Sequence, residues 1–186
     1  MAPNTWLSDP RIGVIIIDKG LTLYQGVRKS NPENQPEKDP FRMTGIRKLK
    51  QYPKDLRGGV YVSFFTESYS LAYDYSNCSG SHEDWHLSAG WVHRFTLQNP
   101  MIALSIPHKQ WDNVLEDMGL DFLETEEIAS SICGLSSEKG EINAIVRING
   151  QQIEEIGICQ PEKFLKYQGS QKCIGHKKID PTWVLW

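Results

Sequence analysis

The chain has 186 residues, with 20 Lys and Arg against 23 Asp and Glu, and a formal net charge of -3. A hydrophobic content of 39% with 10% aromatic residues excludes a mainly disordered chain. The balanced charge argues against nucleic acid as a partner, and no apolar run approaches the roughly 20 residues that span a membrane. We expect a single domain over residues 1–186.

The N-terminus lacks a basic stretch followed by a long apolar core, so no secretory signal peptide is predicted. This favours a cytoplasmic protein, or one that is exported without a signal of that kind. No two cysteines form a C-x-x-C pair, which argues against a structural zinc site and favours reduced thiols. The cysteines are Cys78, Cys133, Cys159 and Cys173.

Seven runs rich in β-branched or aromatic residues predict strands. In chain order they are 13–17, 21–24, 59–65, 90–97, 101–106, 142–148 and 153–159. The polar segment 29–39 contains two prolines and no apolar residue, which predicts a mobile inserted loop. The basic stretch 42–50 indicates the solvated face of a short helix, with an anion-binding patch as the alternative.

Helices are predicted at 68–75, 108–118 and 120–132. The second has the best amphipathic pattern, because its apolar residues recur at i, i+3, i+4 and i+7. These residues are Trp111, Val114, Leu115 and Met118. Strands outnumber helices and do not alternate regularly with them. The sequence therefore predicts an α+β fold and not a doubly wound sheet.

The segment 82–86 fits the pattern H-E-x-x-H. On a helix, His82 and His86 would share one face and hold zinc, while Glu83 would activate the bound water. Glycines and serines on both sides leave little room for the long helix that such enzymes use. A zinc hydrolase is therefore an alternative, and a solvated loop or a short helix is the favoured interpretation of this segment.

Three segments in order along the chain carry a second pattern. Leu23-Tyr24-Gln25-Gly26 ends an early strand. Gly59-Val60-Tyr61-Val62-Ser63 opens another strand, which Leu71-Ala72-Tyr73 follows in a predicted helix. Gly140-Glu141-Ile142 places an acid at the start of a late strand. In order and spacing these segments resemble the signatures of the ADP-ribosyltransferase superfamily. The middle segment is most similar to the poly(ADP-ribose) polymerase and rifamycin-modifying branches.

The resemblance implies two small, mainly antiparallel sheets with NAD, the substrate, in the cleft between them. Cleavage of the nicotinamide–ribose bond creates an oxocarbenium-like sugar, which a carboxylate stabilises. Glu141 would supply that carboxylate, and Tyr61 would lie against the nicotinamide. The remaining residues implied in NAD binding are Tyr24, Gln25, Gly26, Arg28, Ser63 and Tyr73. The activity would be that of a glycosyltransferase, similar to toxins and effectors, with a protein or small-molecule acceptor.

Two departures from the family pattern bear on activity. Gln25 stands where the family has Arg or His, so a charge that grips the dinucleotide is lost, and Arg28 is a candidate to replace it. Lys139 stands where arginine-modifying members have Glu or Gln. A catalytically degenerate binding module on the same fold is therefore the second interpretation.

Overall fold

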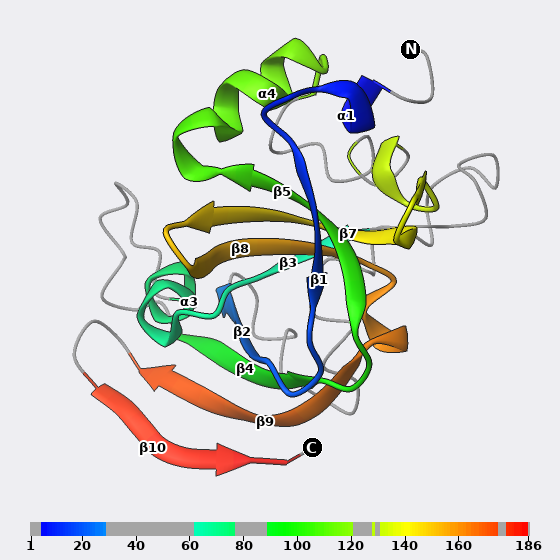
Figure 1. Cartoon of the computed structure of the whole chain (residues 1–186). Coiled ribbons are helices and arrows are strands. Elements are labelled where there is room, and N and C mark those ends of the chain that lie inside the picture. Colours follow the sequence, from blue (N-terminus) through cyan, green and yellow to red (C-terminus); the bar gives the residue numbers. More distant parts are fainter. Residues whose placement is uncertain are drawn as a thin grey trace, which may run out of the picture.

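The structure is a computed structural model that describes residues 5–28, 62–76, 89–120, 128, 131–174 and 178–185. The described residues form a mixed α+β fold in which most elements are strands in two sheets (Figure 1). Every strand pair is antiparallel except β5 with β7. The α+β class and the two mainly antiparallel sheets are as the sequence predicts.

The larger sheet, here sheet A, has the strand order β1-β5-β7-β8-β3, and the short strand β6 pairs with β7. Its strands are β1 (Gly13–Ile17), β3 (Val62–Phe65), β5 (Met101–Pro107), β6 (Ser136–Ser137), β7 (Gly140–Asn149) and β8 (Gln152–Cys159). Strands β1, β7 and β8 are rich in Val and Ile, whose branched side chains suit a pleated surface.

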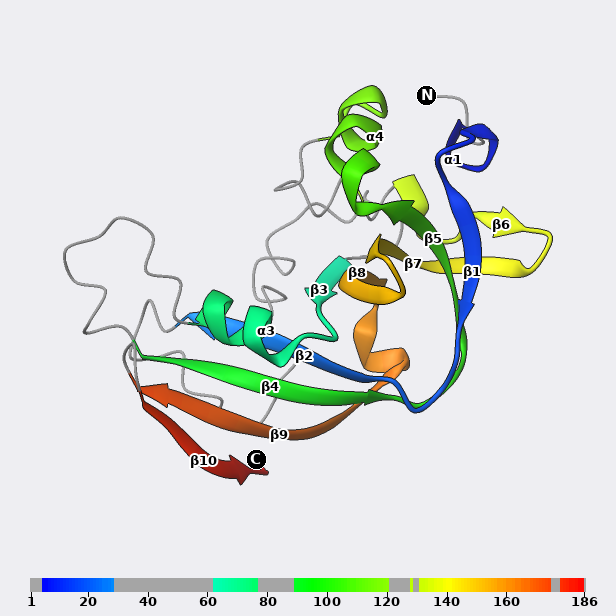
Figure 2. The ribbon, with the colours of Figure 1, turned by 60° about the vertical axis from the view of Figure 1, so that its left-hand side comes forward.

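The smaller sheet, here sheet B, has the strand order β10-β9-β4-β2. Its strands are β2 (Thr22–Arg28), β4 (Ala89–Leu97), β9 (Leu165–Ile174) and β10 (Lys178–Val184). In Figure 2 the two sheets join at the lower right, where β1 continues into β2 and β4 into β5. A single isolated bridge, Tyr24 with Thr66, connects the edge strand β2 to β3.

The helices are short and lie on the outer faces of the sheets. They are α1 (Thr5–Ser8), α3 (Tyr69–Ser76) and α4 (Trp111–Asp117), with 3-10 turns η3 (His108–Gln110) and η4 (Pro161–Lys163). Helix α4 ends because Gly119 adopts a positive φ of 71°. The amide of Leu120 then bonds to the carbonyl of Leu115 at 2.9 Å, which satisfies the last turn.

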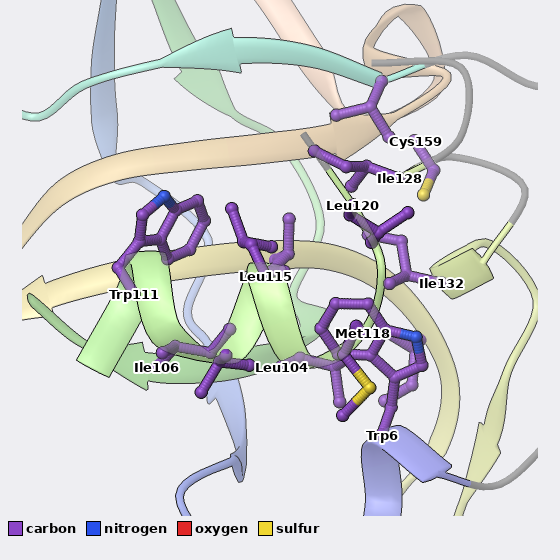
Figure 3. Close-up of a cluster of buried hydrophobic side chains, with 14 residues drawn as sticks. Trp6, Leu104, Ile106, Trp111, Leu115, Met118, Leu120, Ile128, Ile132 and Cys159 are labelled. Atoms are coloured by element: carbon purple, nitrogen blue, oxygen red, sulfur yellow. The ribbon is translucent and has the colours of Figure 1, made fainter. Parts of the chain in front are cut away.

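Two apolar cores hold these layers together. One lies between sheet A and the helices α1 and α4, and all four residues of the predicted amphipathic pattern are buried in it (Figure 3). The other lies between the two sheets and includes Leu23 and Phe95 from sheet B and Phe65 and Ile156 from sheet A. Full burial of each large side chain stabilises the fold by about 1.5–3 kcal/mol.

The sequence expectations differ from the structure in several places. All seven predicted strands exist, although their ends differ and residues 59–61 lie outside the described part. Strands β9 and β10 were not predicted, because both are rich in polar residues. They are strands because β9 pairs with β4 and β10 pairs with β9. The predicted segments at 29–39 and 42–50, and most of 120–132, also lie outside the described residues.

The expectation of reduced thiols is wrong for one pair of cysteines. Cys133 and Cys159 form a disulfide with a Cα–Cα distance of 6.0 Å. Cys159 ends β8 and pairs in register with Val62, the first residue of β3. The disulfide therefore ties the segment before β6 to the end of the β8–β3 ladder. The spacing of the cysteines along the chain contains no sign of this proximity.

Candidate functional site

The candidate site lies at the fork where β2 and β3 separate. Tyr24 and Thr66 exchange two backbone hydrogen bonds, of 2.7 and 2.9 Å. Beyond this bridge the amide of Gln25 enters the fork, and its Nε2 donates to the carbonyl of Phe64 at 3.1 Å. One N–H of the Gln25 amide is therefore bonded to the protein itself. Its Oε1 is buried and has no hydrogen-bond partner within the described residues.

The peptide groups of Gly26 point out of sheet B at this fork. Residues of an antiparallel strand alternate between bonding to one neighbour and to the other. Tyr24 bonds to Thr66 and not to β4, so the N–H and C=O of Gly26, two residues on, face the same open edge. No strand of the described residues pairs with β2 at Gly26. Within the described part of the chain, this edge thus has one backbone donor and one acceptor without a strand partner.

A helix also explains why position 26 is glycine. A Cβ at Gly26 would lie 1.8 Å from the carbonyl oxygen of Ala72 and 2.8 Å from the amide of Ser76, both in α3. The helix can cross β2 this closely only because no side chain is present. Gly26 is therefore held between α3 on one face and the open strand edge beside it.

Tyr24 and Tyr73 belong to an aromatic cluster on the outer face of sheet B, together with Tyr69 and Trp183. Tyr69 lies between the two, with ring centroids 5.5 Å from Tyr24 and 6.4 Å from Tyr73. The guanidinium of Arg94 lies 4.2 Å above the ring of Trp183, a favourable cation–π distance. Because neighbouring residues of a strand face opposite ways, Tyr24 points away from the side of the sheet that carries Gln25.

Ser63 is buried on β3, on the same side of that strand as Phe65 and so toward the space between the sheets. Tyr61 lies outside the described residues. Arg28 ends β2 opposite Gly90, and nothing is described of its side chain. The structure therefore brings Gln25, Gly26 and Ser63 to one fork, with Tyr24 and Tyr73 on the opposite face of sheet B.

Glu141 lies elsewhere, in the hairpin that β6 and β7 form. It pairs with Ser136, and its side chain is exposed. Ser63 is in register with Ile158, and Ile158 with Ala144, so Glu141 is two strands and three residues away from Ser63. In an ordinary sheet that separation is roughly 14 Å. Lys139, two residues before Glu141, donates from Nζ to the backbone carbonyl of Val14 at 2.6 Å.

His93 is a candidate residue that the sequence did not place beside Gln25. It pairs in register with Gln25 and is fully buried. Its Nδ1 lies 2.5 Å from Oγ of Ser170, whereas its Nε2 has no hydrogen-bond partner within the described residues. Burial lowers the pKa of His93 to about 4. The sequence does indicate that His93 is buried. It alternates with Trp91 and Phe95 along the strand, and every second residue of a strand faces the same side of the sheet.

A second polar group lies on the other side of sheet A, beneath Trp111. The guanidinium of Arg147 makes ion pairs of 3.0 Å with both Glu154 and Glu155. His108 contacts the same Glu154 carboxylate. Arg147 also lies 5.7 Å from the ring of Trp111. Because α4 covers this face, the group is separated from the fork by the sheet itself and is best explained as part of the packing.

The polar group of Arg147, Glu154 and Glu155 should make the stability of the fold depend on pH. Burial raises the pKa of Glu155 to about 7, although Arg147 partly opposes the shift. The folded state thus holds a proton that the unfolded chain releases near pH 4.5, so the free energy of unfolding falls as the pH rises from 4.5 to 7. A shift of this size corresponds to up to about 3 kcal/mol.

We expect Glu155→Gln to remove this loss, because the amide carries no charge. Urea unfolding at about pH 4.5 and about pH 7.5 checks it. The stability of the variant relative to the natural chain should rise from the lower to the higher pH. A difference that is the same at both pH values would show that the Glu155 carboxyl titrates normally.

The zinc alternative lies outside the described residues, since none of 82–86 is among them. Among the residues that are described, no three His, Cys, Asp or Glu side chains gather in a group able to hold a metal ion.

No described helix is both long and apolar enough to cross a membrane.

Comparison of the chain with protein-family models gives no match, and comparison with curated proteins gives none either.

Proposed function

We propose that the chain is an ADP-ribosyltransferase-like domain, which binds NAD at the fork between β2 and β3 and transfers ADP-ribose to a protein or small-molecule acceptor. The observation that carries the proposal is the open backbone edge at Gly26. A carboxamide carries an NH2 group that donates and a carbonyl oxygen that accepts, and the C=O and N–H of Gly26 are complementary to them. The nicotinamide of NAD is such a carboxamide.

The arrangement of the other residues supports the same ligand. Gln25 and Ser63 come from different sheets and lie beside the same fork. Among the described residues, a single isolated bridge at Tyr24 joins these two strands. The sequence resemblance includes segments of these elements, β2, β3 and α3.

A second candidate function, a binding module without turnover, is favoured by the position of Glu141. Its side chain is exposed in the β6–β7 hairpin, and its Cα lies roughly 14 Å from that of Ser63 by the sheet register. A carboxylate lowers the barrier only where it lies close to the developing oxocarbenium. Transferase activity therefore requires that Glu141 approach the fork, or that another carboxylate take its role.

The release of nicotinamide from NAD tests the two functions. We expect the natural chain to release nicotinamide, and Glu141→Ala to reduce the rate by at least about 100-fold, the usual cost of removing an electrostatic stabiliser. Glu138→Ala is the matched control, because Glu138 is exposed in the same hairpin and has no proposed role. Binding is measured separately by isothermal titration calorimetry.

Each result separates the candidates. NAD binding without nicotinamide release identifies the binding module. Release that survives in Glu141→Ala assigns the catalytic carboxylate to another residue. A chain that neither binds NAD nor cleaves it excludes both functions.

A further inference from the structure

The last strand of sheet B, β10, is held along only part of its length. It lies at the edge of the sheet, so one side of its backbone has no strand partner among the described residues (Figure 2). It pairs with β9 at 178–179 and again at 183–184, with a register shift between the two pairs. There residues 180–182, which include a proline without an N–H to donate, lie against the single residue Lys172. The backbone ladder alone therefore fastens β10 weakly.

Burial at the end of β10 adds little to this ladder. Side chains are described for residues 182–185, and none of these four is buried. Leu185 is 73% exposed, and Trp183 is the least exposed of the four. A segment at a sheet edge with few buried contacts opens locally at a low free energy. The attachment of β10 therefore depends largely on what Trp183 contacts.

Trp183 packs on the outer face of sheet B against the strand that carries Gly26 and the helix that covers it. Its ring centroid lies 6.4 Å from that of Tyr24 in β2, and 6.4 Å from that of Tyr69, the first residue of α3. Both distances are within the range in which aromatic rings attract each other. The guanidinium of Arg94 lies over the same ring. One side chain of β10 thus contacts both elements beside Gly26.

Hydrogen bonds orient the end of β10 around this ring. The hydroxyl of Tyr69 donates at 2.5 Å to Oε1 of Gln171, which is the residue of β9 that pairs with Trp183. The backbone carbonyl of Val184 accepts from the hydroxyl of Tyr167 at 3.2 Å. These bonds hold the end of β10 on β9, with the ring of Trp183 against β2 and α3.

The strand that Trp183 contacts is also the one that makes the bridge at the fork. The N–H and C=O of Tyr24 bond to Thr66 at 2.7 and 2.9 Å, and among the described residues this isolated bridge is all that pairs β2 with β3. A shift of the Tyr24 side chain would therefore act on that one bridge. It would also move Gly26, which is two residues further along the same strand.

We propose that β10 is a detachable strap and that Trp183 is a positioning residue, which keeps β2 and α3 in the arrangement that bridges the fork. The docked strap fixes the strand edge at Gly26, and its release loosens that edge. Nicotinamide binding at this edge, which rests on the proposed function, is then stronger while the strap is docked. Coupling of this kind is reciprocal, so bound nicotinamide also holds the strap in place.

Hydrogen exchange of single amides, followed by NMR, tests the strap without any ligand. In Trp183→Ala we expect the amides of Tyr24 and Thr66 to exchange about tenfold faster, as the loss of two aromatic contacts and a cation–π contact would give. Trp183→Phe should restore most of the protection, because a phenyl ring again packs against Tyr24 and Tyr69. Leu185→Ala is the matched control and should change neither amide, since this side chain is exposed.

Calorimetry with nicotinamide tests the coupling in the same variants. We expect Trp183→Ala to bind nicotinamide about tenfold more weakly than the natural chain, and Trp183→Phe to recover most of the affinity. Saturating nicotinamide should also slow the exchange of the β10 amides in the natural chain, because the coupling acts in both directions.

The outcomes separate the strap from the proposed function. Unchanged exchange at Tyr24 and Thr66 in Trp183→Ala overturns the strap, whatever the ligand does. An equal acceleration in β5 and β7 also overturns it, because Trp183 would then stabilise the fold as a whole. Faster exchange at the bridge alone, in a chain whose natural form does not bind nicotinamide, supports the strap and excludes the proposed function. Faster exchange with an unchanged nicotinamide affinity leaves the carboxamide site standing and overturns the coupling.

Discussion

Replacing Cys133 and Cys159 together by alanine should lower the free energy of unfolding by about 3–4 kcal/mol, as expected for a disulfide closing a loop of this length. The two residues are 26 positions apart, so the disulfide restricts the unfolded chain substantially. Cys159 is also part of the core beneath α4. Urea unfolding, followed by the fluorescence of the buried Trp6 and Trp111, measures the loss.

Reduction provides the control for this prediction. The natural chain in excess dithiothreitol should unfold at nearly the same urea concentration as the double variant, whereas the double variant should not respond to the reductant. Peptide mapping without reduction should recover a linked peptide that contains both residues. An unfolding midpoint of the natural chain that does not change on reduction would contradict the disulfide.

The Gly26→Ala substitution should both destabilise the fold and remove nicotinamide binding. The new Cβ would meet the carbonyl oxygen of Ala72 at 1.8 Å and the amide of Ser76 at 2.8 Å. Both contacts are to backbone, so the clash is relieved only if α3 moves away from β2. Overpacking of this kind costs about 3 kcal/mol, and the displaced helix would distort the strand edge that is proposed to bind the carboxamide.

Thr22→Ala is the matched control, because Thr22 begins the same strand and pairs with Thr96 at the end of β2 farthest from Gly26. It should change neither the unfolding curve nor the nicotinamide titration. A Gly26→Ala variant as stable as the natural chain would show that α3 does not cross β2 so closely. A destabilised variant that still binds nicotinamide with full affinity would exclude the Gly26 edge as the carboxamide site.

A strand or helix could be predicted where its own residues carry the pattern of that element, without information from distant parts of the chain. β1 is a continuous run of β-branched residues after Gly13, β7 contains four of them, and the predicted segments at both positions are strands. The apolar residues of α4 recur at helical spacing, and the predicted helix exists. β9 gives no such signal, since its sequence L-K-Y-Q-G-S-Q-K-C-I mixes polar residues on both faces. It is a strand because β4 and β10 bond to its two edges, which is information from distant parts of the chain.

Only part of the candidate site could be predicted from the sequence. Gln25, Gly26 and Ser63 come together because Tyr24 and Thr66 bridge β2 and β3, close to the residues that carry the resemblance. The separation of Glu141 could not be foreseen, since it follows from the strand order β7-β8-β3 within sheet A. The same holds for His93, whose position opposite Gln25 depends on the register between β2 and β4.

The sequence alone determined the α+β class, the amphipathic helix and the local strands, because hydrophobic periodicity and side-chain shape act over a few residues. The tertiary structure decided the strand order, the disulfide and the set of polar side chains that share the fork. These depend on contacts between residues far apart in the chain, and a one-residue change of strand register would turn Gln25 or His93 to the opposite face of the sheet.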